Sequence, residues 1–334
     1  MTLLEAPTVV PPPAPAAAPA TKPADPRVST LRSSTWELDV APLTGAALTA
    51  GRIRTADGVW RDLLRPTRRS AIGDPEKCAS FPMVPWSNRL REGVLSFGGR
   101  TWQLQRNGAD GTAIHGAVRY SAWSVVGQSE SSIDLELETT SLVGVNFPWR
   151  FASRIRYEVV DDALRVTTSV RNTDTSSFPA GFGHHPYLQR SLHPAHEQTP
   201  ICPPGQPVVH IPTGRGYALD HGIATGPAGA VPARADFSTP RALGSAFIDD
   251  VLRDWRGVRV TYPEGGVTLD VQADPIYEHL VVYAPRRRAC FAIEPATNVN
   301  GGFALHGAGV PGTGVFVLEP GEERTGSFTF RVSV

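Results

Sequence analysis

The stretch RIRYEVVDDALRVTTSVRN, residues 154–172, decides the fold class of this chain. It predicts two strands joined by a tight turn at Asp161–Asp162, because aspartates favour turns and the flanking residues favour strands. The preceding stretch SIDLELETT, residues 132–140, alternates apolar and acidic residues, which is the period of a half-buried strand. Two adjacent strand predictions with a short turn between them indicate antiparallel pairing.

Glycine pairs mark two further hairpins. GVLSFGGRTWQL turns at Gly98–Gly99, and GVRVTYPEGGVTLDVQA turns at Gly265–Gly266. The chain closes on GSFTFRVSV, in which Phe328, Phe330 and Val332 share a face. No long run has helical periodicity, and 31 prolines and 32 glycines interrupt most stretches that could supply one. The sequence therefore predicts an all-β protein built as a large antiparallel β-sandwich.

The first 30 residues differ in composition from the rest. They are rich in proline and alanine, which predicts a disordered tail, and residues 31–334 contain no linker-like break, which predicts a single domain. The tail has no basic start, carries an early Glu5 and is interrupted by prolines, so it fits neither a signal peptide nor a membrane span.

The net charge and the spacing of the cysteines indicate which binding partners and which cellular compartment to expect. The formal net charge is +0, which argues against nucleic acid or an anionic membrane as the main partner, since both reward a basic surface. Cys78, Cys202 and Cys290 lie far apart, which indicates reduced thiols in a cytoplasmic protein rather than a disulfide framework.

Two stretches resemble known binding motifs, but neither is expected to form a binding site. GAGVPG, residues 307–312, matches the dinucleotide-binding spacing but leads into a strand-like run, whereas that motif must open a helix. His193 and His196 lie in a proline-rich stretch with no helix to align them, so no metal site is expected.

The remaining polar residues follow or precede predicted strands. Each has an ordinary structural interpretation when it is taken alone, but together they could line a concave polar face that suits a polyhydroxylated ligand. Glu294 stands out, because a carboxylate after four apolar residues is expected to be partly buried and then needs a partner or a raised pKa. The set consists of Asn88, Arg89, His115, His184, His185, Asp249, Asp250 and Glu294.

Five sequence blocks resemble the aldose 1-epimerase (galactose mutarotase) family. They are PWSNRLREGVLSFGGRTWQLQRN with AIHG, then GHHPYL, IDD, FAIEP and LEPGEE, in that family's order from residue 85 to residue 323. The resemblance implies the galactose mutarotase-like supersandwich, a small-molecule sugar substrate and no cofactor. It also implies an isomerase that interconverts the α and β anomers of a hexose.

The resemblance also implies roles for single residues. Glu294 would be the general base and His185 the general acid, while Arg89, His115 and Asp249 would hold sugar hydroxyls. Asn88 and Tyr187 are further candidates for substrate binding, and Asp250 is an alternative to Asp249. Pro186 would fix the turn so that His185 points into the site while His184, on the opposite side of extended backbone, points elsewhere.

Two other functions fit the same residues. One is an epimerase for a phosphorylated or sulfonated sugar, for which RPTRRS offers Arg65, Arg68 and Arg69 if they fold over the site. The other is a sugar-binding module without turnover, although such a module needs no acid/base pair.

Overall fold

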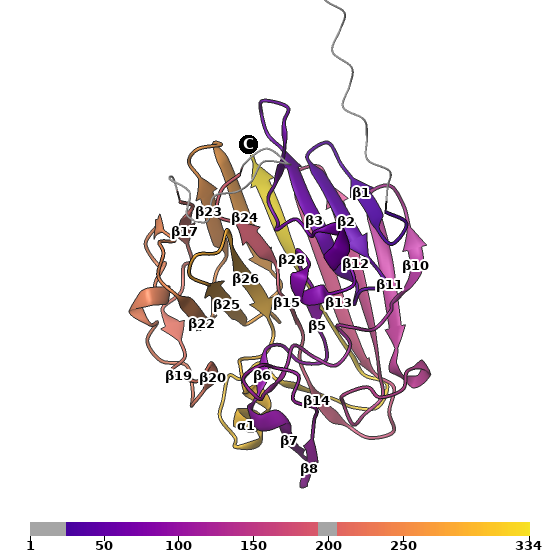
Figure 1. Ribbon diagram of the computed structural model, residues 1–334. Helices are drawn as coiled ribbons and strands as arrows, with labels where there is room; N and C mark the ends of the chain where they lie inside the picture. The colour runs from indigo at the N-terminus through magenta and orange to yellow at the C-terminus, as the bar shows by residue number, and fades with distance from the viewer. Residues whose placement is uncertain (1–24, 193–205) are drawn as a thin grey trace, which may run out of the picture.

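The computed structural model describes residues 25–192 and 206–334, and the strands within these residues pair antiparallel (Figure 1). The predicted disordered tail falls mostly on residues 1–24, and His193, His196 and Cys202 fall on 193–205; all of these lie outside the described residues. The first strand, β1, begins at Ser29, two residues before the predicted start of the domain.

The larger of two main sheets has nine strands. In spatial order they are β10 (Ser124–Gln128), β11 (Ser132–Glu138), β12 (Phe151–Val160), β13 (Ala163–Asn172), β28 (Glu323–Ser333), β24 (Val267–Ala273), β23 (Val258–Tyr262), β17 (Val208–His210) and β21 (Arg241–Ala242). The predicted turn at Asp161–Asp162 is confirmed, since Val160 pairs with Ala163 across it.

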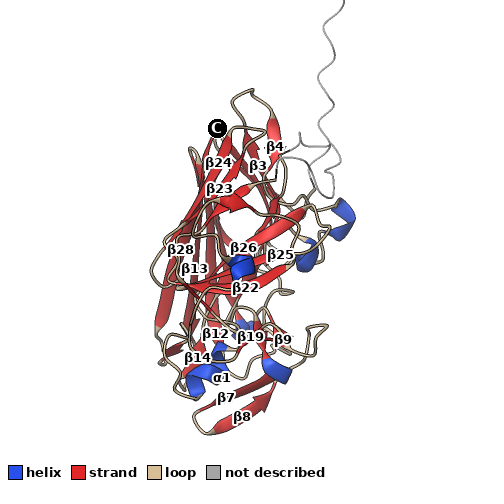
Figure 2. Cartoon of the chain, turned by 90° about the vertical axis from the view of Figure 1, so that its left-hand side faces the viewer, coloured by secondary structure: helices blue, strands red, loops and turns tan. Residues whose placement is uncertain are grey.

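The second main sheet has seven strands and packs against the first. Its order is β18 (Arg215–Gly216), β22 (Ile248–Arg253), β25 (His279–Ala284), β26 (Cys290–Ala296), β15 (Gly183–His184) and β5 (Pro82–Met83), with β16 (Tyr187–Gln189) also paired to β26. Viewed from the side, β13 and β28 lie in one layer and β25 and β26 in the other (Figure 2). This arrangement confirms the predicted β-sandwich.

Smaller elements complete the chain. A four-stranded sheet contains β1 (Ser29–Arg32), β2 (Trp36–Ala41), β3 (Ala47–Arg54) and β4 (Trp60–Asp62). Two-stranded pairs are β6 (Arg89–Leu90) with β9 (Ala113–Ile114), β7 (Val94–Phe97) with β8 (Arg100–Gln103), β14 (Phe178–Ala180) with β27 (Phe316–Leu318), and β19 (Leu219–Asp220) with β20 (Ile223–Ala224). The helical turns are η1 (Arg69–Ala71), η2 (Pro75–Lys77), η3 (Arg91–Gly93), η4 (Thr139–Ser141), η5 (Ala233–Ala235) and α1 (Gly302–Gly307).

The hairpin of β7 and β8 shows why the glycine pair is needed. Phe97 pairs with Arg100, so Gly98 and Gly99 form a two-residue loop, and both have positive φ, 55° and 74°. Two-residue hairpin loops of this type require left-handed backbone at both positions, which glycine adopts without steric cost.

The main hydrophobic core fills the space between the sheets. It joins side chains from Leu31 to Val332, including the fully buried Trp36, Trp86 and Tyr157. Cys78 and Cys290 are buried free thiols, as predicted for these two. In the part of the chain that the structure describes, no helix is long and apolar enough to cross a bilayer.

Candidate active site

A cavity of about 560 Å³ opens on the outer face of the seven-stranded sheet. The alternate residues of the same strands, such as Val282 and Ile293, enter the main core, so the cavity lies on the face away from it. Its walls include every residue that the sequence singled out for catalysis or substrate binding: Asn88, Arg89, His115, His185, Tyr187, Asp249 and Glu294. Residues from five separate parts of the chain therefore meet in one cavity.

His185 and Glu294 face each other because of strand register. Gly183 pairs with Ala296 and Tyr187 pairs with Ala292, so the residue between them, His185, stands opposite Glu294. The His185 Nε2 and Glu294 Oε1 atoms are 3.3 Å apart. Both side chains are buried, and Glu294 Oε2 and His185 Nδ1 make no hydrogen bond within the described residues. Buried polar atoms without partners are uncommon in proteins and indicate a site for ligand or water.

Aromatic rings fix the orientation of the His185 imidazole. It stacks on Phe81, with ring centroids 4.9 Å apart, and against Tyr187, with centroids 4.5 Å apart. The His115 ring packs against it in a T-shaped arrangement, with ring centroids 5.2 Å apart. The His185 backbone N–H donates to the Phe81 carbonyl oxygen. The ring therefore has little freedom to leave Glu294.

Burial shifts both partners towards their uncharged forms. It raises the pKa of the Glu294 carboxyl well above its usual value; the nearby Asp249 carboxylate adds to this shift and the Arg89 guanidinium opposes it. Burial likewise lowers the pKa of His185 to about 3, and the positive charge of Arg65 acts in the same direction. Both shifts favour an uncharged acid beside an uncharged imidazole, and a proton moved across the 3.3 Å gap would convert this state into carboxylate plus imidazolium.

Asn88 and His115 lie next to each other in strained backbone. Their φ angles are 57° and 64°, and the His115 N–H donates to the Asn88 carbonyl oxygen. Asparagine tolerates this left-handed region well, and histidine is also enriched there. These two residues flank the short β6–β9 ladder, which points Arg89 into the cavity. Strain at a position supported by its surroundings is common at functional sites.

Arg89 is held by carboxylates. Its Nε donates to Asp110 Oδ2 at 2.8 Å, and its Nη2 lies 3.5 Å from Asp249 Oδ2. The Asn88 side-chain oxygen accepts from the same guanidinium at 3.1 Å. The cation is thereby placed beside Glu294 without pairing directly with it.

The structure distinguishes the two neighbouring aspartates. Asp249 pairs in register with Tyr283 and shares the outer face with Glu294, whereas the side chain of Asp250 is fully buried and forms a bidentate ion pair with Arg234. Successive strand residues point to opposite faces, so only one of the two can reach the cavity. That residue is Asp249.

His184 is also separated from the site by this alternation, as predicted. Its Nε2 hydrogen-bonds the Thr168 hydroxyl at 2.7 Å, and its ring packs on Phe328 inside the core. It is a core histidine that joins the two sheets.

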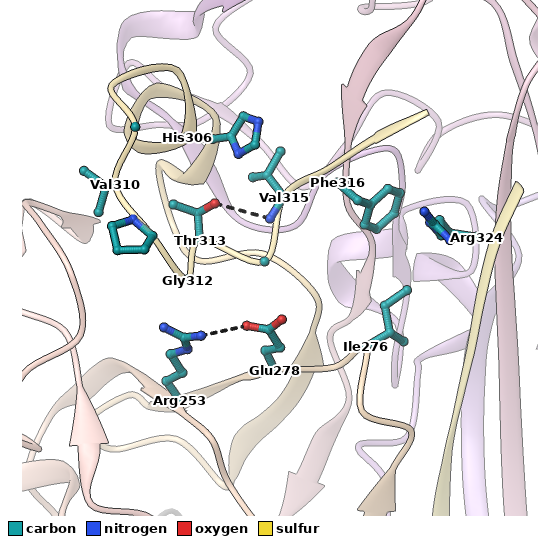
Figure 3. A pocket seen from close by; sticks show the side chains of 13 residues that line it. Arg253, Ile276, Glu278, His306, Val310, Gly312, Thr313, Val315, Phe316 and Arg324 are labelled. Atoms are coloured by element: carbon teal, nitrogen blue, oxygen red, sulfur yellow. Dashed lines mark hydrogen bonds and ion pairs between the residues drawn. The ribbon is translucent and has the colours of Figure 1, made fainter. Parts of the chain in front are cut away.

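A larger cavity, about 730 Å³, lies elsewhere, beside the loop that follows α1 (Figure 3). Arg253 and Glu278 point toward each other across it and form an ion pair at 3.1 Å. Arg253 and Glu278 neutralise each other, and Arg324 pairs with Glu322, which lies outside the lining. The described residues of this cavity include no buried acid/base pair. The smaller cavity is therefore the candidate active site.

The structure adds residues that sequence reasoning did not find. Phe81, Tyr283, Glu76 and Asp110 also line the site. Tyr283 lies within an apolar strand and Asp110 within a Gly-rich turn, so their local sequence resembles ordinary core and loop. Strand register places Tyr283 beside Asp249, whereas Glu76 lies in η2 and Phe81 and Asp110 lie outside the strands. These three reach the site only through the tertiary fold, so no local signal could have found them. Among the described residues, no group of three or more His, Cys, Asp or Glu side chains is arranged to hold a metal ion.

Comparison with known proteins identifies the family of this chain. A family model named Aldose 1-epimerase matches residues 29–331. The uncharacterized protein YphB of Escherichia coli (strain K12) is 28% identical over 255 residues, covering 74% of this chain and 78% of YphB.

Solved structures share the fold. A galactose mutarotase-like protein from Clostridium acetobutylicum superimposes with a TM-score of 0.77 at 18% identity, covering 91% of this chain and 94% of its own. A GalM/aldose epimerase homologue from C. elegans gives 0.74 at 16% identity, covering 92% and 99%.

Proposed function

The chain belongs to the aldose 1-epimerase family, and from this premise we propose that it interconverts the α and β anomers of a hexose by opening and reclosing the sugar ring. The observation that carries the proposal is the buried pair of Glu294 and His185, 3.3 Å apart in a polar cavity. Ring opening needs a base at the C1 hydroxyl and an acid at the ring oxygen. Because both oxygens are bonded to C1, the two groups must lie close together, as these do.

In the proposed mechanism Glu294 is the base and His185 the acid. Sugar hydroxyls that donate to Glu294 Oε2 would stabilise its carboxylate, which leaves the shared proton on His185. Glu294 then takes the proton of the C1 hydroxyl, the bond between C1 and the ring oxygen breaks, and His185 protonates that oxygen. The product is the open-chain aldehyde, and the pair is now a carboxylic acid and a neutral imidazole.

Reclosure runs the same step backwards. Rotation about the C1–C2 bond presents the opposite face of the carbonyl, the C5 hydroxyl attacks it, and the protons return to their starting groups. Arg89, His115 and Asp249 would hold the other hydroxyls while C1 turns, which keeps the reacting atoms in position. No electrons or phosphoryl groups are transferred, so the proposed reaction requires no cofactor.

Polarimetry tests the proposal directly. Freshly dissolved α-D-glucose and α-D-galactose should reach equilibrium faster with the protein than without it, in proportion to protein concentration. A spontaneous rate left unchanged for every aldose tried, together with sugar binding by calorimetry, would instead identify a binding module.

The two aspartates should separate binding from stability. We expect Asp249→Asn to raise KM by about tenfold or more with little change in Tm, because its carboxylate lines the cavity beside Arg89. Asp250→Asn should leave KM unchanged and lower the unfolding free energy by about 1–3 kcal/mol, because it removes the buried carboxylate charge that pairs with Arg234. Steady-state kinetics and urea titration measure both; the opposite assignment of effects would show that Asp250 is the functional residue.

A further inference from the structure

Met83 is a buried methionine that lies behind the wall of the sugar site. It belongs to β5, the edge strand of the seven-stranded sheet, and it packs in a small cluster with Cys78, Phe81 and Tyr187. Its sulfur lies 2.9 Å from Nδ1 of His115, which lines the sugar site. This contact takes no part in the proposed proton transfers.

The backbone holds His115 beside this sulfur. The Ala117 N–H donates at 2.8 Å to the carbonyl oxygen of Val84, the residue that follows Met83. Gly116 has a φ of 77° and passes so close to Val84 that a β-carbon on it would lie 2.2 Å from the same carbonyl oxygen. The segment that carries His115 therefore stays against β5, and the contact between nitrogen and sulfur is a fixed part of the site.

Burial keeps the His115 imidazole uncharged. It lowers the pKa of His115 well below its usual value, and the neighbouring His185, Arg119 and Arg89 act in the same direction. A neutral imidazole carries one N–H and one nitrogen lone pair. The partner of one ring nitrogen decides which of the two nitrogens holds the hydrogen.

Met83 offers His115 an acceptor and no donor, because a thioether sulfur carries lone pairs but no hydrogen. A lone pair on Nδ1 would face the sulfur lone pairs across 2.9 Å, which is repulsive, whereas an N–H at Nδ1 donates to the sulfur. The hydrogen is therefore favoured on Nδ1. Nε2 then keeps its lone pair, and it makes no hydrogen bond within the described residues, so it is left for a ligand in the cavity.

The other acceptors near His115 are already engaged with a cation. Asp110 accepts from Arg89 at 2.8 Å, Asp249 lies 3.5 Å from the same guanidinium, and the Asn88 side-chain oxygen accepts from it at 3.1 Å. The Nε2 lone pair of His115 is thus an acceptor in this part of the cavity that no arginine occupies.

We propose that Met83 is a positioning residue that holds the hydrogen of His115 on Nδ1, so that Nε2 accepts a hydrogen bond from one sugar hydroxyl. This inference rests on the proposed epimerase function and adds a determinant of its specificity. A hydroxyl can donate to Nε2, whereas a fluorine on the same carbon cannot. The site should therefore reject the analogue that carries fluorine at that one position.

The sequence permits a nearly isosteric test, because its only methionines are Met1 and Met83. Norleucine, incorporated in place of methionine, exchanges the Met83 sulfur for a methylene group and otherwise alters only the first residue. Met83→Leu is the encoded alternative, since leucine and methionine usually replace each other in a core at a cost of less than about 1.5 kcal/mol. Norleucine incorporated into Met83→Leu changes Met1 alone and should have no effect.

Nitrogen-15 NMR of the His115 ring reports the position of the hydrogen directly, and its signals are assigned by their loss in His115→Asn. We expect the hydrogen on Nδ1 in the wild type and a mixture of both forms in the norleucine protein and in Met83→Leu. Cys78→Ala is the matched control, because it removes another buried sulfur from the same cluster. It should keep the wild-type form even if it lowers Tm.

Kinetics test the effect on specificity, with glucose and its analogues fluorinated at C3, C4 or C6, each corrected for its spontaneous rate. At the position that His115 contacts, fluorine should lower kcat/KM by at least about tenfold in the wild type. Without the sulfur, Nε2 can carry the hydrogen and donate to fluorine, so this penalty should shrink to less than about threefold. The KM of glucose should rise at least about twofold with kcat nearly unchanged, because less of the protein holds the accepting form.

The outcomes separate this inference from the proposed function. A hydrogen on Nε2 in the wild type, or the same form with and without the Met83 sulfur, overturns the inference while glucose turnover keeps the proposed function. A fluorine penalty that norleucine leaves unchanged at every position also overturns it. Failure to accelerate epimerisation of any aldose overturns the proposed function, and the NMR measurement then still decides whether Met83 places the hydrogen of His115.

Discussion

Glu294→Gln is expected to lower kcat for anomer interconversion by about 10²–10⁴-fold, the usual contribution of one positioned proton-transfer group. Glutamine cannot take the C1 proton. It does resemble the protonated carboxyl that burial favours at this position, so the fold should survive. Polarimetry gives the rate, and circular dichroism and thermal unfolding give the integrity of the variant.

His185→Asn should show a loss of similar size for the complementary reason. In the proposed mechanism the two groups act together on two oxygens bonded to one carbon, so the double variant is expected to be little worse than either single variant. Glu278→Gln and His221→Asn are matched controls, because neither residue lines the sugar site, and both should keep wild-type rates. Full activity in either active-site variant would remove that residue from its assigned role.

Stability is expected to fall steeply on acidification between pH 6.5 and about 4. His184 and His279 are buried, and burial lowers their pKa values to about 3 and about 4, so they bind protons only after unfolding in this range. A histidine whose folded pKa is depressed loses stability as pH falls, at up to about 1.4 kcal/mol per pH unit each. Burial also lowers the pKa of His115, which adds to the slope.

The pair of Glu294 and His185 should add almost no net proton uptake on unfolding in that range. His185 takes up a proton on unfolding, whereas Glu294, whose folded pKa is raised, releases one, and the two effects have opposite signs. The net uptake on unfolding is therefore two or more protons. It lowers the unfolding free energy by about 3 kcal/mol for each pH unit of acidification. Above pH 6.5 the Glu294 effect is no longer offset by His185, and it lowers stability as pH rises, at up to about 1.4 kcal/mol per pH unit.

Urea unfolding at a series of pH values measures this slope. A dependence corresponding to less than one proton per molecule would show that the buried histidines are not held neutral. NMR titration of their ring protons offers an independent check, since the rings of His184 and His279 should not titrate near pH 6.5 while the protein is folded.

Much of the fold could be predicted from local pattern. The alternation in residues 132–140, the turn at Asp161–Asp162 and the glycine pair at Gly98–Gly99 each determine a strand or hairpin from contacts within a few residues. The pairing of β28 with both β13 and β24 could not be predicted in this way. It joins residues more than 50 positions apart, and its register depends on core packing that no local window contains.

The candidate site could likewise be predicted only in part. Glu294 and His185 stand out in the sequence as a carboxylate at the end of an apolar run and a histidine before proline, and the family resemblance implies their roles. The choice between Asp249 and Asp250 stayed open, because adjacent residues differ only in the face they occupy. Tyr283 carries no local signal at all.

By itself, the sequence determined that the chain forms a β-sandwich and which residue types could carry acid/base chemistry, since strand period and turn chemistry are local properties. Only the tertiary structure decided that His185 stands opposite Glu294 and that Asp249 and not Asp250 faces the cavity. The physical reason is register: a shift of one residue in β26 would turn Glu294 towards the core, and only long-range packing prevents that shift.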